Sequence, residues 1–117
     1  MQLDTQVKGD VVVVRVNGDI TMGKGDVILK DKVNSLLQQG HRKILLDLGQ
    51  VSYVDSAGLG QLVQIHATTT RQQAALKLLS VTKRLRDLLV VTKLLVVFDT
   101  FDSEAEALAS FTKAAAV

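Results

Sequence analysis

Short apolar runs that alternate with helical patterns constrain the fold of this chain more than any other feature of its sequence. Residues 11–16, 44–48 and 75–79 are rich in Val, Ile or Leu and have the length of buried strands. Between these runs, apolar residues recur at the spacing of a helix face. Strands that alternate with helices predict an α/β sandwich.

Two weaker strands are expected at the ends of this pattern. Residues 3–8 can pair with 11–16 across Gly9 and Asp10, which suit a two-residue hairpin turn. The run at 95–98 is expected to be the last strand. The predicted sheet therefore has four to five strands and begins with an antiparallel hairpin.

Four helices are expected from apolar spacing and from cap residues. The first ends at Gly40, where a left-handed residue is favoured. The second starts near Ser56, the third follows a cap at Ser80, and a capping-box spacing of Ser103 and Glu106 opens the fourth. The side chains expected to face the core are Leu29, Val33, Leu36, Leu37, Leu59, Leu62, Val63, His66, Val81, Leu85, Leu88, Leu89, Leu108 and Phe111.

The length of 117 residues suits one domain, 1–117, with a single core. The sequence contains no Cys, which excludes a disulfide framework, a thiolate metal site and a thiol nucleophile. The longest apolar runs, such as 94–98, are too short to span a bilayer, and the N-terminus lacks a signal-peptide pattern. We expect a cytoplasmic protein with no membrane partner.

The charge of the chain argues against a nucleic-acid partner. The formal net charge is only +2, and the densest basic runs are 83–86 (Lys-Arg-Leu-Arg) and 41–43 (His-Arg-Lys). Binding to phosphates needs a concentrated basic patch, and single strands also need aromatic platforms, whereas aromatic residues make up 3% of this chain. Both runs are interpreted as solvated faces.

Residues 18–25 (Gly-Asp-Ile-Thr-Met-Gly-Lys-Gly) have the spacing of a phosphate-binding loop between a strand and a helix. Two residues oppose that function. Gly25 stands where a Ser or Thr hydroxyl must coordinate magnesium, and Asp19 places negative charge where phosphates would lie. A nucleotide-binding enzyme that uses this loop and Lys24 is kept as an alternative, but no cofactor and no metal ion is expected.

A serine hydrolase built on Ser56 fails on geometry. Val54 replaces the first glycine of a nucleophile elbow. If Ser56 opens the second helix, His66 lies ten residues along it, which is about 15 Å away at the rise of an α-helix. A general base must lie within hydrogen-bond distance, and His41 follows the stop of another helix. No catalytic residue is therefore assigned, and the chain is not expected to be an enzyme.

Ser56 is better suited to receive a phosphate. Glycine inside a helix costs about 1 kcal/mol relative to alanine, so Gly58 and Gly60 suggest a close approach to the backbone. Together with Ala57 they leave little side chain to screen the hydroxyl from a protein kinase. The structural alternative is that Asp55 or Ser56 is a helix N-cap and that the glycines allow close packing against a strand.

Three segments of the chain resemble the STAS domain. They are residues 55–60 (Asp-Ser-Ala-Gly-Leu-Gly), the expected strand 44–48, and the loop that begins with Gly-Asp-Ile at 18–20. More narrowly, they resemble the stand-alone bacterial anti-sigma factor antagonists. The resemblance extends from Val11 to Phe111 and includes Thr-Lys-Leu-Leu before the last expected strand. It implies a STAS-like mixed β-sheet with helices packed mainly on one face.

The resemblance also implies partner switching. In such a mechanism the unphosphorylated protein binds an anti-sigma factor serine kinase and thereby frees the sigma factor. The kinase, which holds the ATP, phosphorylates the Ser that corresponds to Ser56, and a serine phosphatase resets the protein. A monomer is expected when the protein is free. A constitutive STAS scaffold subunit of a signalling complex is the alternative within the same family.

The site residues follow from the same resemblance. Ser56 matches the phosphorylated position, and the partner surface is expected to comprise Asp19, Thr21, Asp55, Ser56, Ala57, Gly58 and Leu59. The chain differs from many family members in three respects. Family members often carry Gly-Gly between the second helix and the next strand, where this chain has Gln73, Ala74 and Ala75. Lys93 stands where a glycine is common, and the chain is slightly basic where many antagonists are acidic.

Overall fold

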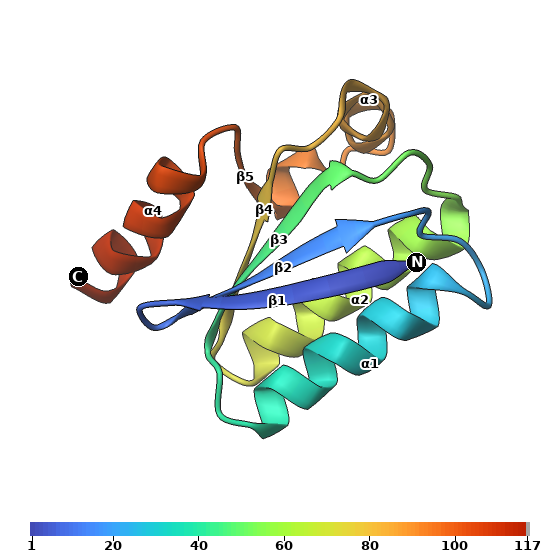
Figure 1. Ribbon diagram of the computed structural model, residues 1–117. Coiled ribbons are helices and arrows are strands. Elements are labelled where there is room, and N and C mark those ends of the chain that lie inside the picture. Colours follow the sequence, from blue (N-terminus) through green and yellow to red (C-terminus); the bar gives the residue numbers. More distant parts are fainter. Residues whose placement is uncertain (117) are drawn as a thin grey trace.

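The computed structural model describes residues 1–116 and contains a five-stranded mixed sheet with the strand order β1-β2-β3-β4-β5 (Figure 1). β1 pairs with β2 in antiparallel orientation, and the other neighbouring strands are parallel. The strands are β1 (Gln2–Lys8), β2 (Val11–Asn17), β3 (Lys43–Gln50), β4 (Ala75–Leu79) and β5 (Asp99–Phe101). The helices are α1 (Gly25–Gln38), α2 (Ser56–Arg71), α3 (Lys83–Val91), the 3-10 helix η1 (Leu95–Val97) and α4 (Glu104–Ala116).

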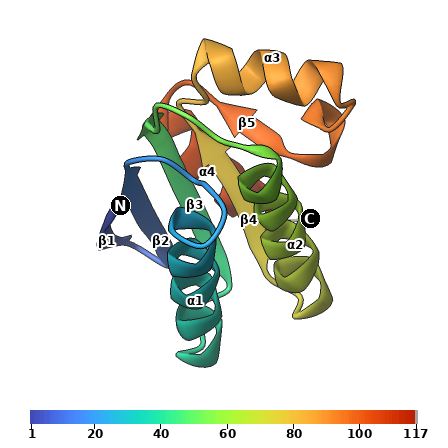
Figure 2. The ribbon, with the colours of Figure 1, turned by 90° about the vertical axis from the view of Figure 1, so that its right-hand side faces the viewer.

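The helices form layers on the sheet. α1 and α2 lie side by side on one face, α4 covers part of the opposite face, and α3 lies across one end of the sheet (Figures 1 and 2). In residues 1–116 no helix is both long enough and apolar enough to cross a membrane. The expected mixed sheet with helices mainly on one face is confirmed.

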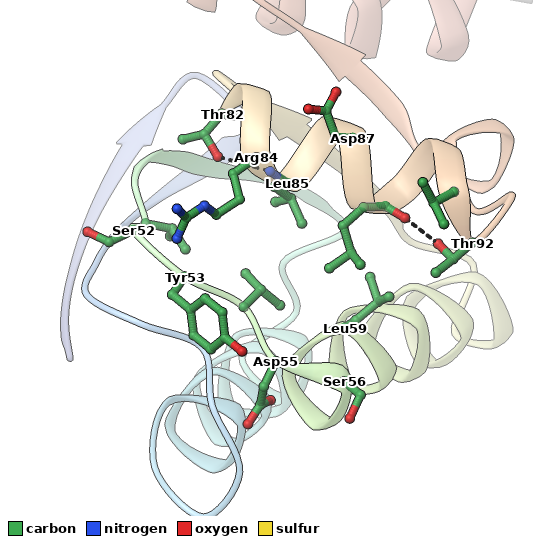
Figure 3. A pocket seen from close by; sticks show the side chains of 14 residues that line it. Ser52, Tyr53, Asp55, Ser56, Leu59, Thr82, Arg84, Leu85, Asp87 and Thr92 are labelled. Carbon is green, nitrogen blue, oxygen red and sulfur yellow. Dashed lines mark hydrogen bonds between the residues drawn. The ribbon is translucent and has the colours of Figure 1, made fainter.

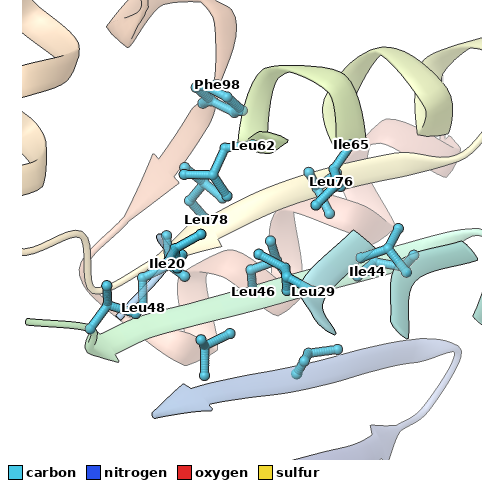
Figure 4. Packing of buried hydrophobic residues seen from close by; sticks show 14 of the residues in the cluster. Ile20, Leu29, Ile44, Leu46, Leu48, Leu62, Ile65, Leu76, Leu78 and Phe98 are labelled. Carbon is cyan, nitrogen blue, oxygen red and sulfur yellow. The ribbon is translucent and has the colours of Figure 1, made fainter. Parts of the chain in front are cut away.

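The core has two parts because successive strand residues point to opposite faces of the sheet. Val12, Val14 and Leu46 belong to a large cluster under α1, α2 and α3, part of which Figure 4 shows. Val13 and Leu45 belong to a smaller cluster that Ala107 and Phe111 of α4 complete. Both faces of the central parts of β2 and β3 are therefore buried, which explains the continuous apolar runs at residues 11–14 and 44–46.

Several turns and caps follow the sequence pattern. Lys8 pairs with Val11 across the two-residue turn, in which Gly9 has a φ of +66°. Gly40 ends α1 with a φ of +95°. At α4, the Ser103 hydroxyl accepts a hydrogen bond from the Glu106 amide at 3.3 Å. Phe111 is buried as expected, whereas Leu108 is only half-buried.

The expected strand at 95–98 is wrong. Leu95–Val97 form the 3-10 helix η1, in which the Val97 amide donates a hydrogen bond to the Leu94 carbonyl at 3.0 Å. The last strand, β5, begins only after this turn. Val96 is 92% exposed, while Phe98 is buried in the core. A short apolar run has the same composition in a turn and in a strand, so its pattern alone does not separate the two.

The expected cap of α3 is also wrong. Thr82 is the N-cap, and its hydroxyl accepts a hydrogen bond from the Leu85 amide at 3.3 Å. Ser80 instead has a left-handed φ of +57°, and its amide donates to the Phe101 carbonyl at 2.8 Å. The pairing of β4 with β5 therefore extends to Ser80 and delays the start of the helix.

Gln73 and Lys93 both adopt left-handed backbone conformations. Their φ values are +59° and +61°. A residue with a Cβ in this conformation costs roughly 1–2 kcal/mol. Both residues follow helices and direct the chain into the next element, and glycine would adopt these conformations without this steric cost.

Replacement of Lys93 by glycine tests this steric cost. We expect Lys93→Gly to raise the free energy of unfolding by up to about 1 kcal/mol, because glycine avoids the steric cost but loses more entropy on folding. Lys93→Ala is the matched control, since it removes the same charge and keeps the Cβ. Urea unfolding should give the glycine variant the higher midpoint, and equal midpoints for the two variants would contradict the explanation.

Candidate functional site

Three loops meet at the edge of the sheet where the parallel strands β2, β3 and β4 end. Because parallel strands present their carboxyl ends at the same edge, the segments 18–24, 51–55 and 80–82 gather there. The first carries Asp19 and Thr21, and the second leads directly into Ser56 at the start of α2. The structure thus brings together the residues that the sequence assigned to a partner surface.

Ile20 joins the first two loops. It is fully buried and forms an isolated parallel bridge with Val54. Its amide donates to the Tyr53 carbonyl at 3.0 Å, and its carbonyl accepts from the Asp55 amide at 3.3 Å. These bonds fix the exposed Asp19 and the half-buried Thr21 beside the start of α2.

Asp55 caps α2 and ties the neighbouring loop to it. Its carboxylate accepts hydrogen bonds from the Gly58 amide at 2.7 Å and from the Met22 amide at 3.0 Å. These two hydrogen bonds lower the pKa of Asp55 below its ordinary value, because both favour the charged form of the carboxyl group. The bond from the Met22 amide has the larger effect, and the bond from the Gly58 amide the next largest. The cap is therefore a carboxylate at neutral pH.

Two helix starts approach the same backbone segment through glycine. A Cβ on Gly58 would lie 1.9 Å from the Ile20 carbonyl oxygen, and a Cβ on Gly25 would lie 2.2 Å from the Asp19 carbonyl oxygen. Gly60 differs, since a Cβ there would meet nothing within 4 Å. Internal packing thus explains Gly58 and Gly25 and leaves Gly60 without a structural reason.

Ser56 is the first residue of α2, and its side chain is exposed. Because Asp55 is the N-cap, the Ser56 hydroxyl has no capping role, and it makes no hydrogen bond with residues 1–112, whose side chains the structure describes. Ala57 beside it is half-buried, and Leu59 is buried. The structure therefore separates two roles that the sequence left open, the cap at Asp55 and an available hydroxyl at Ser56.

The loop 18–25 is not shaped as a phosphate cradle. Such a cradle directs free amides at the phosphates. Here the amides of Ile20, Met22 and Lys24 donate to the Tyr53 carbonyl, to the Asp55 carboxylate and to the Thr21 carbonyl. The Met1 side chain packs against Gly25. These contacts oppose the nucleotide-binding alternative.

His66 takes part in packing. Its ring lies edge-on to the Phe98 ring, with 5.3 Å between the centroids. It is a half-buried residue on α2, ten positions beyond Ser56. His66 was expected on the face of α2 that turns toward the core, and the structure places it at the edge of that face.

An apolar groove of about 490 Å³ opens between the start of α2 and α3 (Figure 3). Leu59 of α2 and three side chains of α3, Leu85, Leu88 and Val91, line it, and Ser56 also borders it. The sequence did not predict this contribution of α3. It could have been inferred because the loop after β4 ends at the same sheet edge as the loops after β2 and β3.

The comparisons with known proteins agree with this architecture. The sequence matches the model of the STAS domain over residues 2–107. The TM1081 homolog of Thermotoga neapolitana, named a candidate anti-sigma factor antagonist, is 29% identical over 99 residues, which cover 85% of this chain and 88% of that protein. The crystal structure of TM1081 from Thermotoga maritima, described by the same candidate role, has a TM-score of 0.85, 25% identity and 92% coverage of each chain. Phosphorylated SpoIIAA from Bacillus shares the fold, with a TM-score of 0.70, 21% identity and coverage of 94% of this chain and 97% of that one.

The two glycines of α2 provide a matched test of the close approach. We expect Gly58→Ala to lower the free energy of unfolding by about 3 kcal/mol, because the new Cβ overlaps the Ile20 carbonyl. Gly60→Ala should instead raise it by about 0.5–1 kcal/mol, since alanine is the better helix former and the space is open. Urea unfolding measures both changes. Equal effects of the two substitutions would contradict the assignment.

The Asp55 cap predicts a pH dependence of stability. Since the folded state lowers the pKa of Asp55, its contribution is present above the unfolded pKa of about 3.9 and is lost as the pH falls through the folded pKa. The variant Asp55→Asn should therefore be less stable than the wild type at pH ~7, with a smaller difference at pH ~3. Urea midpoints at both pH values measure this. Asp31→Asn, an exposed carboxylate of α1, is the control, and a pH-independent effect of Asp55→Asn would contradict the cap.

Proposed function

The chain belongs to the STAS domain family, and from this premise we propose that it is an anti-sigma factor antagonist that acts by partner switching. The observation that carries the proposal is the Ser56 hydroxyl at the glycine-rich start of α2. This hydroxyl is exposed, and it does not cap the helix, because Asp55 does. The names of the relatives from Thermotoga support the same role. The protein acts as a binding module, and the ATP belongs to its partner.

In this mechanism the unphosphorylated form binds an anti-sigma factor serine kinase, and the sigma factor is released. The kinase phosphorylates Ser56 and thereby ends binding, and a serine phosphatase removes the phosphate. The partner surface comprises residues around the meeting point of the two loops: Asp19, Thr21, Asp55, Ser56, Ala57 and Leu59. Gly58, which the sequence also assigned to this surface, is buried against the Ile20 carbonyl and positions its neighbours. The free protein is a single-domain monomer, and it acts in the cytoplasm because its partners control transcription.

The charge at the site indicates why a phosphate acts on the partner and not on the fold. A phosphate on Ser56 adds about −1.5 to −2 charges at neutral pH. The N-terminus of α2 favours this charge, whereas the ionised Asp55 opposes it. The two effects offset each other within the chain, and the added charge lies on an exposed surface that the kinase must cover.

Two substitutions at Ser56 test the switch. We expect Ser56→Ala to bind the kinase as the wild type does and to accept no phosphate. Ser56→Asp should bind at least about tenfold more weakly, because it places charge in the interface. Isothermal titration with the purified serine kinase of the same organism measures the affinities, and mass spectrometry measures the phosphate. Gln64→Glu, which adds a charge to an exposed position on the same helix, is the control and should bind normally.

The outcomes separate this function from its alternatives. Equal affinities of the wild type and both Ser56 variants would contradict the switch. A large oligomer on size exclusion, together with no phosphate, would instead favour the scaffold subunit. Tight binding of ATP that Lys24→Ala abolishes would favour the nucleotide-binding enzyme.

A further inference from the structure

The groove between α2 and α3 reaches into the hydrophobic core (Figure 3). Val51, Val54, Leu59 and Leu85 line it, and all four are buried members of the main core cluster. Its volume of about 490 Å³ lies within the range of roughly 300–1,000 Å³ that is typical of small-molecule pockets. The groove is therefore a concave site with an apolar floor and not only a patch of exposed surface.

The hydroxyl groups on the α3 side of the groove form hydrogen bonds within the protein. The Thr82 hydroxyl accepts from the Leu85 amide at 3.3 Å, and the Thr92 hydroxyl donates to the Leu88 carbonyl at 2.7 Å. Among residues 1–112, whose side chains the structure describes, no buried side-chain nitrogen or oxygen lacks a hydrogen-bond partner. An ordered water needs about two to four polar partners, so water over this floor is weakly held, and an apolar molecule displaces it favourably.

The charges around the groove offset one another. The Asp87 carboxylate is paired with Lys83, which lies just outside the lining, at 3.0 Å. The Asp55 carboxylate already accepts two backbone hydrogen bonds, and Arg84 carries the opposite charge in the same lining. Neither sign is in excess, and an ionised group would lose its hydration against the apolar floor. These features select an uncharged ligand.

We propose that this groove is a binding site for an uncharged, largely apolar small molecule. Leu59, Leu85 and Leu88 contact its hydrocarbon part. Tyr53, which lines the groove and is 48% exposed, offers its phenolic hydroxyl to one polar group of the ligand. The site needs neither a kinase nor a phosphate, so it goes beyond the proposed function, although Ser56 borders it.

Three probes with the same hydrocarbon chain test the proposal. 1-Octanol, octanoate and octylamine are neutral, anionic and cationic at pH ~7. We expect 1-octanol to give saturable NMR shifts of the methyl groups of Leu59, Leu85 and Leu88. Its Kd should be at least about tenfold lower than that of either ion, because neither charge is compensated at the apolar floor.

Two tryptophan substitutions on α3 provide a matched test of the location. Leu88 is half-buried and lines the groove, so Leu88→Trp fills part of it and should weaken 1-octanol binding at least about tenfold. Val90 is 54% exposed and does not line the groove, so Val90→Trp should bind as the wild type does. Circular dichroism checks that both variants fold. The comparison of the three probes uses the wild type and does not depend on either variant.

Three results would overturn the proposal. The first is an affinity for octanoate or octylamine that equals or exceeds the affinity for 1-octanol, which would indicate a ligand selected by charge. The second is an absence of saturable shifts at the groove with 1-octanol, which would leave the groove to a protein segment. The third is an equal loss of binding in the two tryptophan variants. All of these measurements use the unphosphorylated protein alone, so their failure is distinguishable from a failure of the switch at Ser56.

Discussion

The close approach of two helix starts to the backbone of residues 19–20 determines the arrangement of the whole site. Gly58 of α2 faces the Ile20 carbonyl, Gly25 of α1 faces the Asp19 carbonyl, and neither position has room for a Cβ. Ile20 is fully buried and bridges to Val54. Because this contact joins the loop after β2 to the loop after β3, it sets where Asp19, Asp55 and Ser56 lie relative to one another.

The start of α2 divides its tasks between adjacent residues. Asp55 holds the fold, since its carboxylate caps the helix and binds the Met22 amide, while the Ser56 hydroxyl faces solvent. A modification of Ser56 therefore leaves the cap intact. The apolar groove beside it adds α3 to the same surface, so Ser56 borders a groove that two helices line.

Most of the fold could be predicted because local patterns and tertiary structure agree. The apolar strands, the turn at Gly9 and the helix end at Gly40 each follow from sequence chemistry and appear in the structure. The start of α3 and the last strand could not be predicted, because pairing of β4 with β5 decides where both lie. The sequence also could not separate Gly58 from Gly60 or assign Arg84 to the groove, since these distinctions depend on contacts between distant segments.

The central claim is that Ser56 carries a reversible phosphate, and phosphopeptide mass spectrometry tests it most directly. The protein is isolated from its own cells under several growth conditions, and the peptide that contains Ser56 is quantified with and without phosphate. The account predicts phosphate on Ser56 whose occupancy rises and falls with the conditions. Its complete absence in every condition, with the unmodified peptide well detected, would contradict the account and leave the exposed hydroxyl without a role.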